Sequence, residues 1–116
     1  LDEKMMGSPV YMPPEFLSAG MKKRRGSFKS AHFARDVYSF SMLMWAVFAS
    51  VEPFPECRFG YEVKQMVVNR DMRPDLSVVP AELRSVLIRA WHTNPKVRPD
   101  FDTLSKELGK ISGFLT

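Results

Sequence analysis

Residues 36–49 read Asp36-Val37-Tyr38-Ser39-Phe40-Ser41-Met42-Leu43-Met44-Trp45-Ala46-Val47-Phe48-Ala49, and this stretch decides the fold. It is apolar on nearly every side, so a helix formed here belongs either in a protein core or in a membrane. The run falls short of the roughly 20 residues that a bilayer requires. The sequence therefore predicts a buried central helix over residues 36–50, capped at its start by the Asp36 side chain.

Shorter helical patterns follow this stretch. Pro53 and Pro55 end the central helix, because two prolines so close together exclude helical backbone. Residues 61–68 then place apolar side chains on one helical face, Pro80 starts another helix, and Asp100 stands before a last one. The apolar positions of these three helices are Val63, Met66 and Val67, then Leu83, Val86, Leu87 and Ala90, then Phe101, Leu104, Leu108 and Ile111. No strand alternation is seen, so the predicted class is all-α.

The residues before the central helix are rich in breakers and in charge. Residues 1–17 contain glycine and several prolines and predict an ordered loop with one helical turn over residues 15–17. The chain carries a formal net charge of +4, and much of it sits in the run 22–25, Lys-Lys-Arg-Arg. A nucleic-acid binder spreads such charge along a face and interleaves exposed aromatic residues. We therefore interpret residues 18–35 as a solvated basic loop and expect no nucleic-acid partner.

The cysteine and the histidines give no sign of a metal site. Cys57 is the single cysteine, so it forms no internal disulfide and a reducing, cytoplasmic setting is expected. His32, His92 and Cys57 lack the spacing of metal ligands, and we interpret them as structural or surface residues. The sequence therefore predicts no metal ligand in this chain and no membrane partner.

Three segments, in this order, resemble the end of a protein kinase domain. Residues 7–15, Gly-Ser-Pro-Val-Tyr-Met-Pro-Pro-Glu, are similar to the end of the activation segment. Residues 36–45 are similar to the central helix of the large lobe. Residues 91–99 are similar to the turn before the last helix of that lobe. The residues of these segments follow the pattern of tyrosine-kinase-like serine/threonine kinases. Within that group the chain most resembles receptor-interacting protein kinases and mixed-lineage-kinase-domain-like proteins. The resemblance implies an all-α C-terminal-lobe fragment. Its parts would be the activation-segment end and substrate loop (1–17), a basic insertion loop (18–35), the central helix (36–50) and the remaining helices (51–116).

The resemblance also implies roles for individual residues. Gly7, Ser8, Tyr11 and Pro14 correspond to the loop that receives a protein substrate, and tyrosine kinases usually have tryptophan at the position of Tyr11. Serine and threonine substrates are therefore expected. Asp36 corresponds to an aspartate that accepts hydrogen bonds from the backbone of the catalytic loop, a role compatible with the predicted helix cap.

Glu15 and Arg98 are the acid and base that we expect to pair. Both stand in proline-bordered turns between apolar elements, and an arginine presents a planar fork that matches a carboxylate. Such a pair would fasten the loop at the start of the chain to its last helices. The alternative is that both side chains are solvated surface charges, in which case either substitution would change stability little.

The chain lacks the groups that carry out phosphoryl transfer. It contains no glycine-rich loop, no Val-Ala-Ile-Lys lysine, no His-Arg-Asp loop and no Asp-Phe-Gly, which we expect upstream of Leu1. No catalytic and no cofactor-binding residue is therefore assigned here, and ATP and magnesium belong to the parent domain. The expected parent is a kinase that transfers the γ-phosphoryl group of ATP to serine or threonine. This portion would dock the substrate and anchor the catalytic loop, and it would be inert alone. The alternative is a pseudokinase or scaffold lobe that acts by binding proteins.

Two further expectations concern the surface. Residues 24–28, Arg-Arg-Gly-Ser-Phe, resemble a substrate sequence of basophilic kinases, which makes Ser27 a candidate phosphorylation site against the alternative of an unmodified loop. The few helices of this chain cover only part of a central helix that is apolar all round. We therefore expect the isolated chain to expose a Met- and Phe-rich surface and to associate or aggregate.

Overall fold

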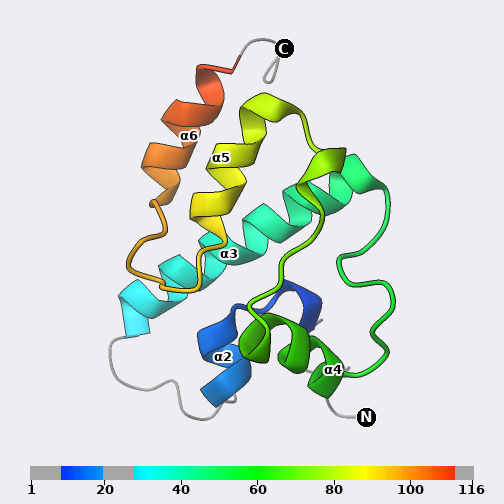
Figure 1. The fold of residues 1–116 in the computed structure, drawn as a ribbon. Helices are drawn as coiled ribbons and strands as arrows, with labels where there is room; N and C mark the ends of the chain where they lie inside the picture. The colour runs from blue at the N-terminus through cyan, green and yellow to red at the C-terminus, as the bar shows by residue number, and fades with distance from the viewer. Residues whose placement is uncertain (1–8, 20–27, 112–116) are drawn as a thin grey trace.

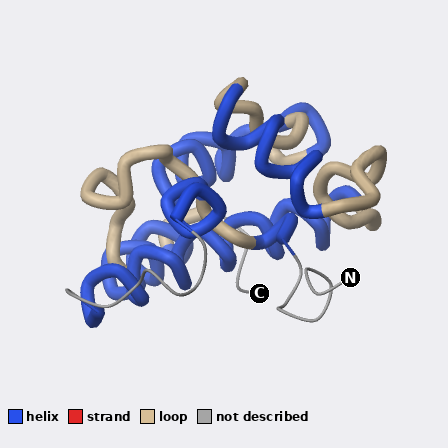
Figure 2. The backbone as a smooth tube through the Cα atoms, turned by 90° about the horizontal axis from the view of Figure 1, so that it is seen from below, coloured by secondary structure: helices blue, strands red, loops and turns tan. Residues whose placement is uncertain are grey.

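The computed structural model describes residues 9–19 and 28–111 as helices joined by loops, with no strand in these two ranges. The all-α class is thereby confirmed, and the tube in Figure 2 shows helix and loop only. The elements are η1 (Pro9–Tyr11), α2 (Pro14–Ala19), α3 (Phe28–Ala49), α4 (Gly60–Lys64), the π-helical turn η3 (Gln65–Asn69), η4 (Leu76–Val78), α5 (Ala81–Ala90) and α6 (Phe101–Gly109).

Helix α3 runs through the middle of the molecule and separates two groups of elements (Figure 1). Helices α5 and α6 lie on one side of it, and α2 and α4 lie on the other. Helix α3 contacts η1, η4 and α5, while α6 packs on α5 and α2 packs on α4 and η3. The Trp45 indole N–H donates a 2.7 Å hydrogen bond to the Asp75 carbonyl and fixes α3 to the segment before η4.

The start of α3 differs from the sequence expectation. The helix begins at Phe28 and spans 22 residues, so Asp36 lies inside it and cannot cap its first turn. Residues 28–35 contain no glycine or proline and include Ala31 and Ala34, and alanine has the highest helix propensity of all residues. The predicted basic loop is correspondingly shorter, because residues 18 and 19 belong to α2 and residues 28–35 belong to α3. The run 22–25 and Ser27 lie outside the described residues.

One side of α3 is buried and the other is open. Val37, Tyr38, Met42 and Trp45 form the centre of the core, together with valines and leucines of α4, η3, α5 and α6. On the opposite side Leu43 is 52% exposed and Val47 is 68% exposed. The expected open apolar surface is therefore present on α3, where phenylalanine, leucine and valine side chains are exposed. The methionines expected there are buried, because Met42 and Met44 face the core.

The C-terminal end of α3 has a left-handed cap. Ser50 has a φ of 61°, and its N–H donates to the Ala46 carbonyl at 2.8 Å, which closes the last turn. Glycine adopts this backbone conformation without the steric cost that any side chain adds. The sequence thus places a serine where the backbone favours glycine.

We expect Ser50→Gly to stabilise the full-length protein by about 1 kcal/mol, because it removes the left-handed strain. Ser85→Gly is the matched control: Ser85 is exposed in the middle of α5, and there replacing serine by glycine should cost about 0.5 kcal/mol. Urea unfolding of both variants measures the difference. A loss of stability in both would contradict the role given to the Ser50 backbone.

Candidate functional site

A buried arginine joins three separate segments. Both Nη atoms of Arg98 donate to the Glu15 carboxylate, each at 2.8 Å, so the two side chains that sequence analysis paired form a bidentate ion pair. Arg98 Nη1 also donates to the Ala34 carbonyl at 3.1 Å, and Nε donates to the His92 carbonyl at 2.8 Å. The Arg98 side chain is 0% exposed and that of Glu15 is 21% exposed. The guanidinium therefore fastens α2 and the α5–α6 turn to α3.

The aromatic ring of Tyr38 supports this arginine. The guanidinium carbon of Arg98 lies 5.2 Å from the centre of the Tyr38 ring, and that of Arg73 lies 5.4 Å from the same centre. Both distances fit an attraction between a cation and the π electrons of the ring. Tyr38 is fully buried, and among the described residues its hydroxyl has no hydrogen-bond partner. The ring acts as a common support for two arginines.

The environment of Tyr38 keeps its hydroxyl protonated. Burial raises the pKa of Tyr38 to about 12, because the phenolate would lose its hydration. The charges of Arg73 and Arg98 oppose this rise, while those of Glu15 and Asp71 add to it. Burial has the largest effect on this pKa, so the Tyr38 hydroxyl stays protonated at neutral pH despite its two positive neighbours.

Arg73 is a structural residue that sequence reasoning missed. Its Nε donates to the Trp91 carbonyl at 2.9 Å, its Nη2 donates to Thr93 Oγ1 at 3.1 Å, and it lies 3.5 Å from the Asp71 carboxylate. It therefore joins the segment before η4 to the α5–α6 turn. A signal was available, because Arg73 and Arg98 each stand directly before a proline, in a turn between apolar elements.

The loop that precedes α2 lies against the same part of α3. Ser39 Oγ donates to the Tyr11 carbonyl at 2.7 Å, and Val10, Pro13 and Pro14 are buried beside it. Burial, and then the negative charge of Glu52, raise the pKa of the Tyr11 phenol. Gly7 and Ser8 lie outside the described residues. The predicted loop residues Tyr11 and Pro14 are thus held close to the Glu15–Arg98 ion pair.

Asp36 lies away from this ion pair, in the open stripe of α3. Its side chain is half exposed and lies 3.4 Å from the guanidinium of Arg35. Asp36, Leu43 and Val47 are separated by seven and four residues, which places them along one face of a helix. A carboxylate therefore stands at one end of an exposed apolar stripe.

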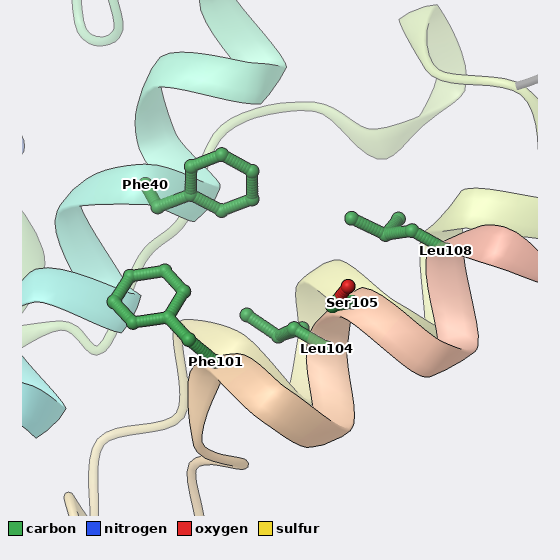
Figure 3. A pocket seen from close by; sticks show the side chains of 5 residues that line it. All are labelled: Phe40, Phe101, Leu104, Ser105 and Leu108. Atoms are coloured by element: carbon green, nitrogen blue, oxygen red, sulfur yellow. The ribbon is translucent and has the colours of Figure 1, made fainter. Parts of the chain in front are cut away.

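A pocket of the described residues is apolar. A pocket between α3 and α6 is lined by Phe40, Phe101, Leu104, Ser105 and Leu108 (Figure 3). The Phe40 and Phe101 rings meet edge to face, 5.8 Å apart, and no charged side chain lines the pocket. Among the side chains that the structure describes, no three from histidine, cysteine or acidic residues come together to hold a metal ion. No helix in the described part of the chain could span a membrane.

Arg98→Ala should destabilise the full-length protein by about 3 to 5 kcal/mol, because the Glu15 carboxylate would be left partly buried without its partner. Arg89→Ala is the control. Arg89 also forms a bidentate pair, with Glu107, but its side chain is 41% exposed, so the expected loss is about 1 kcal/mol or less. Thermal unfolding compares the two variants. Equal unfolding midpoints of the two variants would contradict the larger contribution to stability that we assign to Arg98.

Tyr38→Phe should leave the protein as stable at neutral pH, or more stable by about 1 kcal/mol, because it removes a buried hydroxyl without a partner. The folded-state pKa of about 12 lies above the ordinary value of 10.0, so the unfolded chain loses this proton first. Between these values the wild type should lose about 2 to 3 kcal/mol as the pH rises, and the variant should lack this component. Urea unfolding near neutral pH and at about pH 11, where about half of this loss is expected, tests the difference. Parallel losses in both proteins would contradict it.

Comparison with known proteins identifies the family. The family model for protein tyrosine and serine/threonine kinases matches residues 2–108. The chain is 29% identical over 106 residues to the dual specificity protein kinase shkA of Dictyostelium discoideum, covering 90% of this chain and 18% of that protein. It is 31% identical over 110 residues to human receptor-interacting serine/threonine-protein kinase 1, covering 90% and 15% of the two chains. It is 29% identical over 110 residues to mouse receptor-interacting serine/threonine-protein kinase 4, covering 89% and 13%. The chain thus spans less than a fifth of the length of these relatives, and it belongs to the protein tyrosine and serine/threonine kinase family.

Proposed function

We propose that the full-length protein transfers the γ-phosphoryl group of ATP to serine or threonine hydroxyls of protein substrates, and that this chain holds the loop that receives the substrate. The observation that carries the proposal is the attachment of residues 9–19 to α3. Glu15 is paired with Arg98, and the Tyr11 carbonyl accepts a hydrogen bond from Ser39. A substrate hydroxyl reacts only when it is held in a fixed position, and a loop fastened at two points supplies such a position.

Two comparisons favour serine and threonine as acceptors. The names of two relatives describe serine/threonine-protein kinases, although shkA is named a dual specificity kinase. Tyr11 stands where tyrosine kinases usually have tryptophan. We place Tyr11 and Pro14 at the substrate side of the loop and, by the resemblance, also Gly7 and Ser8. Pro14 is buried, so it supports the loop from the protein interior.

The open stripe of α3 supports a second part of the proposal, in which the rest of the kinase domain packs on this helix. Leu43 and Val47 are exposed apolar residues, and Asp36 lies in line with them. Apolar side chains gain stability when a neighbour covers them, and a carboxylate beside that neighbour can accept hydrogen bonds from its backbone. We therefore assign Asp36 the role of anchor for the catalytic loop, as an acceptor within the helix.

The cofactors belong to another part of the protein in this proposal. Kinases cradle the phosphates of ATP and hold magnesium with carboxylates, and the motifs that do so are not found in this sequence. We propose that residues elsewhere in the full-length protein bind ATP and magnesium. A cytoplasmic location stays a prediction from the single cysteine.

The test is an assay of the full-length protein with magnesium, ATP radiolabelled at the γ-phosphate and a mixed protein substrate. We expect phosphoserine and phosphothreonine after acid hydrolysis, with little phosphotyrosine. Leu43→Glu should reduce the activity by at least about tenfold, because a carboxylate would be buried under the covering part of the domain. Ile88→Glu is the control, since Ile88 is similarly exposed on α5, away from the stripe.

The alternative function is that of a pseudokinase or scaffold lobe. A folded protein that transfers no phosphate to any substrate, while still binding protein partners, would replace the kinase proposal with this one. Equal activity in the Leu43→Glu variant and the wild type would contradict the packing of the rest of the domain on α3.

A further inference from the structure

A pair of exposed aromatic rings stands at the start of α4. Phe59 and Tyr61 are stacked, with ring centres 5.7 Å apart and ring planes 5° from parallel. Phe59 is 45% exposed and Tyr61 is 59% exposed. Aromatic faces carry partial negative charge, so two parallel rings at a surface offer a good contact for a cation. The described residues place no cation over either ring.

The loop that presents these rings is held in a strained but braced conformation. Phe54 has a φ of 52°, in the left-handed region that residues other than glycine rarely occupy, and its side chain is buried. The Glu62 carboxylate accepts hydrogen bonds from the N–H groups of Arg58 at 2.6 Å and Phe59 at 3.0 Å. Backbone strain of this kind clusters at functional sites, where it positions groups in advance. The loop therefore presents the ring pair in a fixed place.

The charge of this segment is opposite to that of the chain as a whole. Residues 50–62 contain three carboxylates, Glu52, Glu56 and Glu62, and one guanidinium, Arg58, whereas the whole chain is +4. Glu62 is engaged in bracing the loop and faces Arg58. Glu52 and Glu56 are exposed. Lys64 is exposed about one turn after Tyr61, so residues 50–64 carry three carboxylates and two cations. The segment that carries the ring pair thus has a small net negative charge, which favours cationic side chains over phosphates.

This surface lies next to the loop that holds Tyr11. Helix α4 contacts η1, and α4 lies beside α2 at the same end of the molecule (Figure 1). The charge of Glu52 contributes to the raised pKa of Tyr11, so this carboxylate stands near the tyrosine. A polypeptide that reaches the substrate loop would pass beside the acidic loop.

We propose that Phe59, Tyr61, Glu52 and Glu56 form a docking surface for an arginine- or lysine-bearing segment of the protein substrate. Guanidinium or ammonium groups of that segment lie over the ring faces, and the two carboxylates neutralise their charge. This inference rests on the proposed function, because it names the substrate class of the same loop. It differs from that function in having a readout that needs no phosphoryl transfer.

The binding test uses the full-length protein without ATP. The probe is a fluorescent arginine-rich peptide with one serine, and its analogue with glutamine in place of every arginine is the matched ligand. Fluorescence anisotropy should show tighter binding of the arginine peptide. The double variant Phe59→Leu/Tyr61→Leu should weaken that binding by about tenfold, because leucine keeps the apolar surface and removes the ring faces.

Further variants separate the contributions of rings and charges. Tyr61→Phe keeps the ring and should retain wild-type affinity for the arginine peptide, and Ile88→Ala on α5 should do the same. Glu56→Gln should weaken binding several-fold at low salt and by less at high salt, because ions screen an exposed charge. Equal affinity of the arginine and glutamine peptides for the wild type, or an unchanged affinity in the double variant, would overturn the proposal.

The kinetic test keeps this proposal apart from the proposed function. With ATP and magnesium, the double variant should lower kcat/KM for the arginine peptide by about tenfold and leave kcat/KM for the glutamine peptide unchanged. If the wild type transfers no phosphate but binds the arginine peptide more tightly, the kinase proposal fails and the docking surface stands. A double variant that changes self-association in sedimentation, and not peptide binding, would assign the rings to a contact between copies and overturn the docking proposal.

Discussion

The arrangement of the whole chain depends on the buried guanidinium of Arg98. It spans 83 positions of sequence to reach Glu15, and it also donates to the carbonyls of Ala34 and His92. Four hydrogen bonds therefore leave one planar group in fixed directions, and the Tyr38 ring covers its face. A lysine has neither the planar fork nor the flat surface that stacks on a ring, so it could not replace these contacts. The cost of burying the charge is offset only while all these partners are present.

The position of the loop that holds Tyr11 follows from this arrangement. Three neighbouring residues of α3 contact residues that are distant in sequence. The Ala34 carbonyl accepts a hydrogen bond from Arg98, and the Tyr38 ring lies against the same guanidinium. Ser39 donates a hydrogen bond to the Tyr11 carbonyl. Since α3 is a single rigid helix, these three contacts cannot shift independently. The loop is therefore placed by one helix, although the arginine that pairs with Glu15 comes from the opposite end of the chain.

The sequence was sufficient where the physical signal was local and strong. An apolar run too short for a bilayer predicted the central helix, and the proline-bordered turns around Glu15 and Arg98 predicted their pairing. The start of α3 was not predictable from the Asp36 cap signal, because no breaker between Phe28 and Arg35 stops the helix. The role of Arg73 depends on a ring that lies 35 positions earlier, and the left-handed backbone of Phe54 has no residue signature. Such features follow from tertiary packing and not from propensity.

One side of α3 is buried in the core, and the opposite side is exposed. The buried side carries Tyr38, Met42 and Trp45 and closes the core of this chain, whereas the stripe of Asp36, Leu43 and Val47 is half or more exposed. A neighbour that packs on the stripe meets the same rigid helix that holds the Tyr11 loop. Its position and that of the loop are then fixed relative to each other without direct contact. In the proposed function, the carboxylate of Asp36 stands in line with these apolar residues because it fixes the backbone of the covering segment.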